Sequence, residues 1–136
     1  MSLSDLSGQP SLSRLLDRSE IPSRAVGIFW LGGPSLVLKS PSQRVYLFDP
    51  EFSNWNGRIP VGAIDVRPDV VVGTGVSRSG LDISTLTHLA AAFPEVRFVA
   101  SEASRDEMIG RSEHLSDEVP INPARVHEIT SGDRLN

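Results

Sequence analysis

The sequence predicts an α/β domain in which a three-stranded antiparallel meander precedes strands that alternate with helices on a mixed sheet. Three apolar runs joined by short turns occupy residues 25–48, a spacing typical of consecutive hairpins. From residue 68 onward, short β-branched runs alternate with segments of helical period. With 136 residues, of which 39% are hydrophobic, the chain is long enough for one domain with a single core.

The composition narrows the classes of function. The net charge is −4 and the 13 Lys and Arg residues form no basic stripe, so we expect no nucleic-acid partner. Every apolar run is far shorter than the roughly 20 residues that span a bilayer, so we expect no membrane contact. The chain has no cysteine, which excludes disulfides and thiolate chemistry. Its first residues lack the apolar core of a secretory signal, and we expect a cytoplasmic protein.

The N-terminal region differs from the rest of the chain. Residues 1–20 are predicted to be a flexible lead that contains a short amphipathic helix over residues 11–18, and residues 21–136 are predicted to form the domain. Leu12, Leu15 and Leu16 share one face of that helix. Two interpretations stay open: the helix packs on the edge of the domain, or it binds a partner.

The meander is predicted from three runs. Residues 25–31 (AVGIFWL) favour a buried strand, residues 35–40 a second strand and residues 44–48 a third. The turn at Gly32-Gly33-Pro34 separates the first two strands. The loop over residues 51–67 has no period, and it is either functional or a plain crossover.

The alternating half begins with residues 68–74, predicted as a strand buried on both faces. A helix follows from Leu81, capped by Asp82 or Ser84 and ended by Pro94. Then come a strand over residues 96–100, a helix that Ser101 caps and Gly110 ends, and a strand over residues 125–129.

Three local patterns, in this order and spacing, resemble the N-terminal half of metallo-β-lactamase-fold proteins. They are WLGGPSLVLK at residues 30–39, VYLFDP at residues 45–50 and ITSGD at residues 129–133. The nearest branch is the lactonase-like one that includes the L-ascorbate-6-phosphate lactonases. The resemblance implies that the domain is half of an αββα sandwich, with a second sheet to be supplied by another copy or by a partner chain.

The family's metal motif, Thr-His-x-His-x-Asp-His, is replaced in this chain. The matching loop is TGVSRSG at residues 74–80, in which Gly75, Ser77, Ser79 and Gly80 take the places of the three His and the Asp. Asp82 matches a family Asp that lies two residues beyond the motif. Ser hydroxyls are poor neutral ligands and Gly has no side chain, so we expect no metal and no cofactor.

Four residues are weak candidates for catalysis: Asp49, Ser77, Ser79 and Asp82. In the family, the Asp that Asp49 resembles supports the metal ligands; without them, a turn role before Pro50 is favoured. A nucleophilic Ser needs an adjacent base, and no His is near in sequence. The three histidines, at positions 88, 114 and 127, match no ligand spacing and are expected to be structural or exposed.

The same loop is a weak candidate for anion binding because it precedes a helix N-terminus and offers backbone N–H groups. Its residues would be Thr74, Gly75, Ser77, Arg78, Ser79 and Gly80. The alternative is a ligand-free loop that remains after loss of a metal site.

Three hypotheses for function follow. The first is a non-catalytic protein that acts through self-association, as a homodimer, or through a partner chain. The second is a metal-dependent hydrolase of lactonase, esterase or phosphodiesterase type, with ligands from another chain. The third is a binding module for an anionic metabolite at the Gly/Ser loop.

Overall fold

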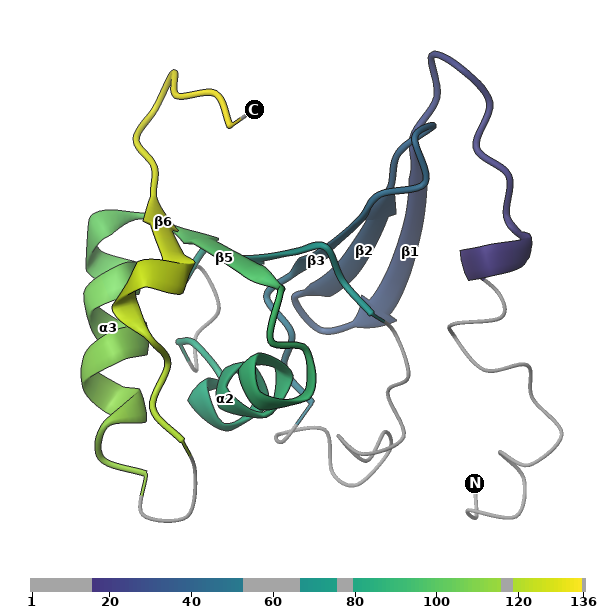
Figure 1. Cartoon of the computed structure of the whole chain (residues 1–136). Coiled ribbons are helices and arrows are strands. Elements are labelled where there is room, and N and C mark those ends of the chain that lie inside the picture. The colour runs from purple at the N-terminus through teal and green to yellow at the C-terminus, as the bar shows by residue number, and fades with distance from the viewer. Residues whose placement is uncertain (1–15, 53–66, 76–79, 116–118, 136) are drawn as a thin grey trace, which may run out of the picture.

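The computed structural model describes residues 16–52, 67–75, 80–115 and 119–135. Within them, six strands form one mixed sheet and two α-helices pack against it (Figure 1). The strands are β1 (Gly27–Gly32), β2 (Ser35–Lys39), β3 (Val45–Phe48), β4 (Val70–Gly73), β5 (Arg97–Ala100) and β6 (Val126–Glu128). The helices are α2 (Ile83–Ala92), α3 (Glu102–Ser112) and the short 3₁₀ helix η3 (Pro123–Arg125).

The strands lie side by side in chain order, from β1 at one edge to β6 at the other. The first three pair antiparallel, whereas β3, β4, β5 and β6 pair parallel. The α/β class and the antiparallel meander followed by parallel strands are therefore as predicted. The identification of this sheet as half of a metallo-β-lactamase-like sandwich stays a prediction.

Both α-helices lie on one face of the sheet. Each joins two neighbouring parallel strands, β4 to β5 and β5 to β6, and both connections step the same way along the sheet. Because such crossovers are right-handed, α2 and α3 cover the same side, as Figure 1 shows. A row of side chains in register across this face forms the centre of the core: Phe29, Val37, Leu47, Val71, Phe98 and Val126.

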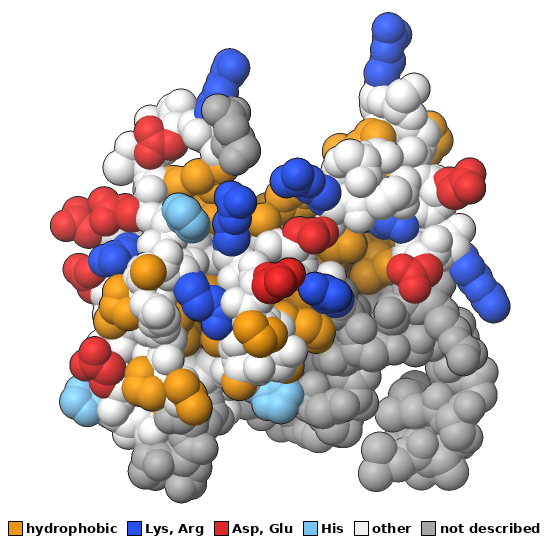
Figure 2. All heavy atoms as spheres, in the orientation of Figure 1, with side chains coloured by type: hydrophobic (Ala, Val, Ile, Leu, Met, Phe, Trp, Pro, Cys, Tyr) orange, Lys and Arg blue, Asp and Glu red, His pale blue; other side chains and the backbone are white. Residues whose placement is uncertain are grey.

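Within the residues that the structure describes, no helix covers the opposite face, which we call the open face (Figure 1). Successive side chains of a strand alternate between the two faces. Two rows therefore form the open face: Ile28, Leu38, Tyr46, Val70 and Arg97 in the first, and Trp30, Leu36, Phe48, Val72, Val99 and His127 in the second. Figure 2 shows hydrophobic side chains in the hollow between the two upper projections of the molecule.

Two predictions about burial are wrong because one face of the sheet is open. The run over residues 25–31 is not a buried strand, because Ile28 and Trp30 are 69% and 74% exposed. The prediction that residues 68–74 are buried on both faces is also wrong, because Val70 and Val72 are only half-buried. In both strands, the side chains on the helix side are more buried than their neighbours on the open face: Phe29 and Leu31 are half-buried beside exposed Ile28 and Trp30, and Val71 is fully buried beside half-buried Val70 and Val72.

Within the described residues, the N-terminal segment joins the core through Leu16. Residues 16–18 are helical, and Leu16 belongs to the core cluster. Lys39, which is 3% exposed, donates hydrogen bonds from its ammonium to the carbonyls of Leu16 and Ser19. The other residues of the predicted amphipathic helix lie outside the described residues.

Both α-helices begin at the predicted N-cap residues. Asp82 caps α2 and Ser101 caps α3. The predicted stop at Gly110 is wrong, since α3 continues to Ser112. The Ser112 hydroxyl is held by two local bonds, donating to the Ile109 carbonyl and accepting from the Ile121 N–H, so the last turn is tied to the rest of the domain. None of the described helices has the length and apolar character needed to cross a bilayer.

Candidate functional site

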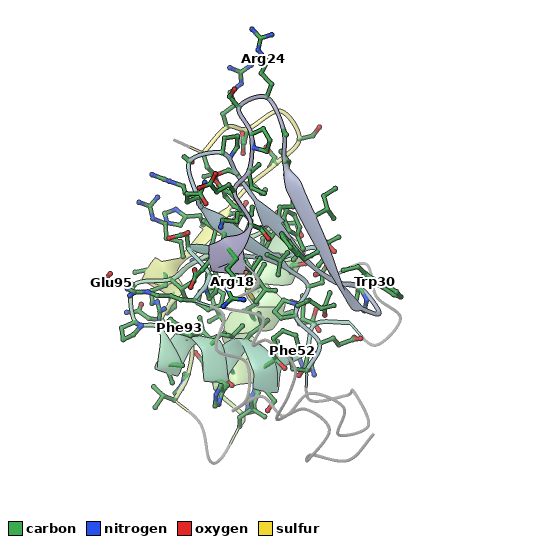
Figure 3. The ribbon with its side chains drawn as sticks, turned by 90° about the vertical axis from the view of Figure 1, so that its right-hand side faces the viewer. Arg18, Arg24, Trp30, Phe52, Phe93 and Glu95 are labelled. Atoms are coloured by element: carbon green, nitrogen blue, oxygen red, sulfur yellow. The ribbon has the colours of Figure 1, made fainter. Side chains whose placement is uncertain are left out.

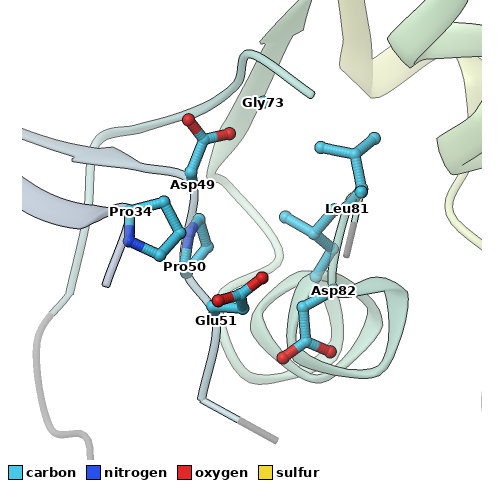
Figure 4. A pocket seen from close by; sticks show the side chains of 9 residues that line it. Pro34, Asp49, Pro50, Glu51, Gly73, Leu81 and Asp82 are labelled. Atoms are coloured by element: carbon cyan, nitrogen blue, oxygen red, sulfur yellow. The ribbon is translucent and has the colours of Figure 1, made fainter. Parts of the chain in front are cut away.

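The candidate site lies where the sequence places it, beyond the carboxyl ends of β3 and β4 and beside the start of α2 (Figure 4). A small cavity there is lined by Pro34, Asp49, Pro50, Glu51, Gly73, Gly80, Leu81, Asp82 and Leu86. The structure therefore brings together two of the four predicted catalytic residues, Asp49 and Asp82. The cavity has a volume of only about 10 Å³, which is at the lower limit for one water molecule.

Asp49 holds the end of β3 against the end of β4. Its Oδ1 accepts a hydrogen bond from the Thr74 N–H at 2.7 Å, and its Oδ2 accepts one from the Thr74 hydroxyl. Its own N–H donates to the Val72 carbonyl at 2.9 Å. The residue has a φ of +43°, in the left-handed region that turns use. These contacts tie the bend at Asp49 to the end of β4.

Asp82 is bonded to the helix that it begins. Its Oδ1 accepts from the Thr85 N–H at 3.3 Å and its Oδ2 from the Thr85 hydroxyl at 2.8 Å. The Thr85 hydroxyl in turn accepts from the Phe52 N–H at 3.2 Å. Figure 4 shows the Asp49 carboxylate directed toward Gly73 and the Asp82 carboxylate directed away from it, toward α2. The two carboxylates do not converge on a common point.

Replacing Asp82 by alanine is expected to lower the free energy of unfolding by about 1–2 kcal/mol, because the first turn of α2 loses its cap. Asp82→Asn is the matched control, since an amide oxygen still accepts from Thr85, and its loss should be well under half as large. Urea unfolding followed by circular dichroism measures both. Equal stability of Asp82→Ala and the unmodified chain would contradict the capping role.

The Gly/Ser loop is described only at its ends. Ser77, Arg78 and Ser79 lie outside the described residues, so two catalytic candidates and half of the anion candidates are not placed. Gly75 and Gly80 have φ values of +68° and +73°, which glycine adopts without strain. A Cβ atom on Gly75 would also lie 2.8 Å from the Ser104 hydroxyl. These two glycines are thus explained by the backbone they form.

Two charged residues that the sequence does not point to lie beside this loop. A Cβ atom on Gly80 would lie 3.3 Å from Glu107 Oε1 and 4.0 Å from Arg111 Nη1. Arg111 donates to Glu107 at 2.6 Å and to the Leu81 carbonyl at 3.3 Å. The i,i+4 spacing of this pair on α3 is visible in the sequence, but its position beside the loop depends on how α3 packs.

A wider hollow lies at the carboxyl ends of β4, β5 and β6. It is lined by residues 72–74, 100–103 and 129–131. The N-terminus of α3 opens into it, but Ser101 already caps that helix by accepting from the Ser104 N–H at 3.3 Å. Glu102 adds a negative charge in the first turn, which opposes an anion there. This hollow lends no support to the anion hypothesis.

The histidines are exposed and lie on different segments. His88 is on α2, His127 is on β6 and His114 follows α3. Among the described residues, no three potential ligands of the His, Cys, Asp or Glu type come together in an arrangement that would hold a metal ion.

Comparison of the chain with known protein families and with characterised proteins yields no match. The function is therefore argued from the geometry of the fold and of the candidate site.

Proposed function

We propose that this chain is a non-catalytic interaction protein, related to the N-terminal half of metallo-β-lactamase-fold proteins, that acts by burying its open face against another protein layer. The single observation that carries the proposal is the apolar character of the open face, over which the described part of the chain places no helix. The relationship to the family rests on the local patterns at residues 30–39, 45–50 and 129–133 and on the order of the strands.

Exposure of the apolar side chains on the open face to water is unfavourable for the isolated chain. Burial of a large apolar side chain contributes about 1.5–3 kcal/mol relative to exposure, and Ile28 and Trp30 forgo most of it in the isolated chain. The helices α2 and α3 already form one layer against the sheet, as stable domains require. A second layer, over the open face, would remove both rows of its side chains from water.

Two copies related by a two-fold axis would supply that layer with the same patch on each side. A partner chain with an apolar face of its own is the other form of the same proposal. Catalysis receives no support from the described residues of the site, because the carboxylates of Asp49 and Asp82 are bonded to Thr74 and Thr85.

Val72→Lys tests the open face at its centre, since β4 lies between β3 and β5. The charge must lose water when the second layer covers it, so we expect the dissociation constant of the assembly to rise by about 30-fold or more. The measurement is sedimentation velocity over a concentration series, with circular dichroism to establish that the variant is folded.

The matched control is His88→Lys, which adds the same charge to an exposed position on α2, on the helix side of the sheet. It should leave association unchanged. Association of Val72→Lys as tight as that of the unmodified chain would contradict the proposal.

A further inference from the structure

We infer that β1 is a dimerisation edge, at which two copies of this chain pair their β1 strands antiparallel and join two six-stranded sheets into one. This inference rests on the self-association named in the proposed function, because it identifies the partner as a second copy. It places the contact at the backbone edge of β1 and leaves the centre of the open face uncovered, so Val72→Lys, three strands away, should leave this dimer intact whereas Ile28→Lys should not.

The first observation is that β1 has the composition of an interior strand although it lies at an edge. Its sequence, GIFWLG, has no charge and no proline. Among the described residues it pairs with β2 alone, so alternate N–H and C=O groups point outward. Edge strands of monomeric proteins are normally protected by charges, proline or a bulge within the strand. The one irregularity in β1 falls between Trp30 and Gly32, which leaves residues 27–30 in regular register.

The second observation is the position of the exposed apolar side chains. The most exposed large hydrophobic residues of the sheet are both on β1, namely Ile28 and Trp30. Figure 3 shows Trp30 at the far end of β1, at the periphery of the molecule. Across an antiparallel strand pair, side chains that face each other lie on the same side of the sheet and contact one another. A second β1 strand would therefore contact these two side chains from one side and pair with the backbone edge.

The third observation is that the opposite edge is short and polar. β6 has only three residues, and both His127 and Glu128 are exposed and polar. The carbonyl of Val126 already accepts a hydrogen bond from Arg105 Nε at 3.3 Å. Among the described residues, β1 is then the one regular and uncharged edge, and pairing at it alone ends at two copies and does not continue into a filament.

The strand is suited to pairing with itself. A two-fold axis beside Phe29 places Ile28 of each copy opposite Trp30 of the other, which keeps all four side chains on the open face. Since β1 has no charge, the symmetric arrangement brings no like charges together.

The test combines hydrogen exchange with one pair of variants. Amide exchange of the full chain is followed by NMR from micromolar to millimolar concentration, together with the solution mass. We expect the outward amides of β1 to exchange at least about tenfold more slowly in the dimer, because hydrogen bonding protects them. The amides of His127 and Glu128 on β6 should not change. Ile28→Lys should abolish the dimer, whereas His127→Lys, the same change at the other edge, should keep it.

Each outcome decides the inference. A dimer with protected β1 amides that Ile28→Lys disrupts supports it. A dimer whose β1 amides exchange as in the monomer overturns the inference and leaves the proposed function in place, with the contact moved to the face that Val72→Lys tests. A chain that stays monomeric at millimolar concentration overturns the inference, and the proposed function then requires a different chain as partner.

Discussion

Phe98→Ala is expected to lower the free energy of unfolding by about 4 kcal/mol, the largest loss that we predict for one substitution. The ring has no exposed surface and lies in β5 between Val71 and Val126 in the register of the sheet. Truncation leaves a cavity under α2 and α3 that these elements cannot fill without shifting. Urea unfolding at equilibrium measures the loss.

The control for Phe98 is leucine, which keeps most of the volume and should cost about 1.5 kcal/mol. A loss below 1 kcal/mol for alanine, by the same core-truncation scale, would mean that Phe98 is not at the centre of the core. Retention of the far-ultraviolet spectrum in both variants shows that the comparison is made between folded proteins.

Arg125→Met is expected to cost about 3 kcal/mol, since it removes a set of charge-assisted hydrogen bonds at the end of α2. The guanidinium donates to the carbonyls of Ala90, Phe93 and Val96 at distances of 2.8–3.3 Å. It also lies 5.4 Å from the centroid of the Phe98 ring, within the range of a cation–π contact. Methionine keeps the apolar stem and leaves the carbonyls without their donor.

Lysine is the matched control for Arg125. It keeps the charge but cannot reach three carbonyls in one plane, so it should recover less than half of the loss. Desolvation by burial lowers the pKa of Arg125, so its charge, present in both the folded and the unfolded chain at neutral pH, costs some stability there. Stability of Arg125→Met within 0.5 kcal/mol of the unmodified chain, the range of ordinary surface changes, would contradict the capping role.

The sequence was a good guide to local structure and a poor one to burial. The caps at Asp82 and Ser101 depend on side chains that bond three residues ahead, so the local sequence suffices to predict them. The run over residues 25–31 predicts a strand in the correct place, but an edge strand with one uncovered face has the same composition as a buried one. The exposure of this strand depends on where α2 and α3 pack. The sequence of residues 25–31 carries no information about that packing.

In the candidate site too, the local sequence predicts some features, whereas others depend on contacts between distant segments. The turn role of Asp49 was favoured by the following proline, but its partner Thr74 is 25 residues away and is brought there by the pairing of β3 with β4. The sequence predicts Arg125 at the start of a strand, whereas it ends η3 and bonds the last turn of α2 across 35 residues of sequence. Gly110 was read as a helix stop, but the anchoring of Ser112 by Ile121 carries α3 past it. Contacts between residues so far apart in the sequence depend on how the elements pack. The spacing of residue types along the chain does not predict them.

The solution mass of the purified chain by light scattering, with metal content determined on the same sample, is the most direct test of the central claim. We expect a metal-free dimer, in which the open face or the β1 edge of each copy is in contact with the other. A monomer that holds stoichiometric zinc, manganese or iron would contradict it, because a metal bound by this chain alone would make the hydrolase hypothesis the better explanation.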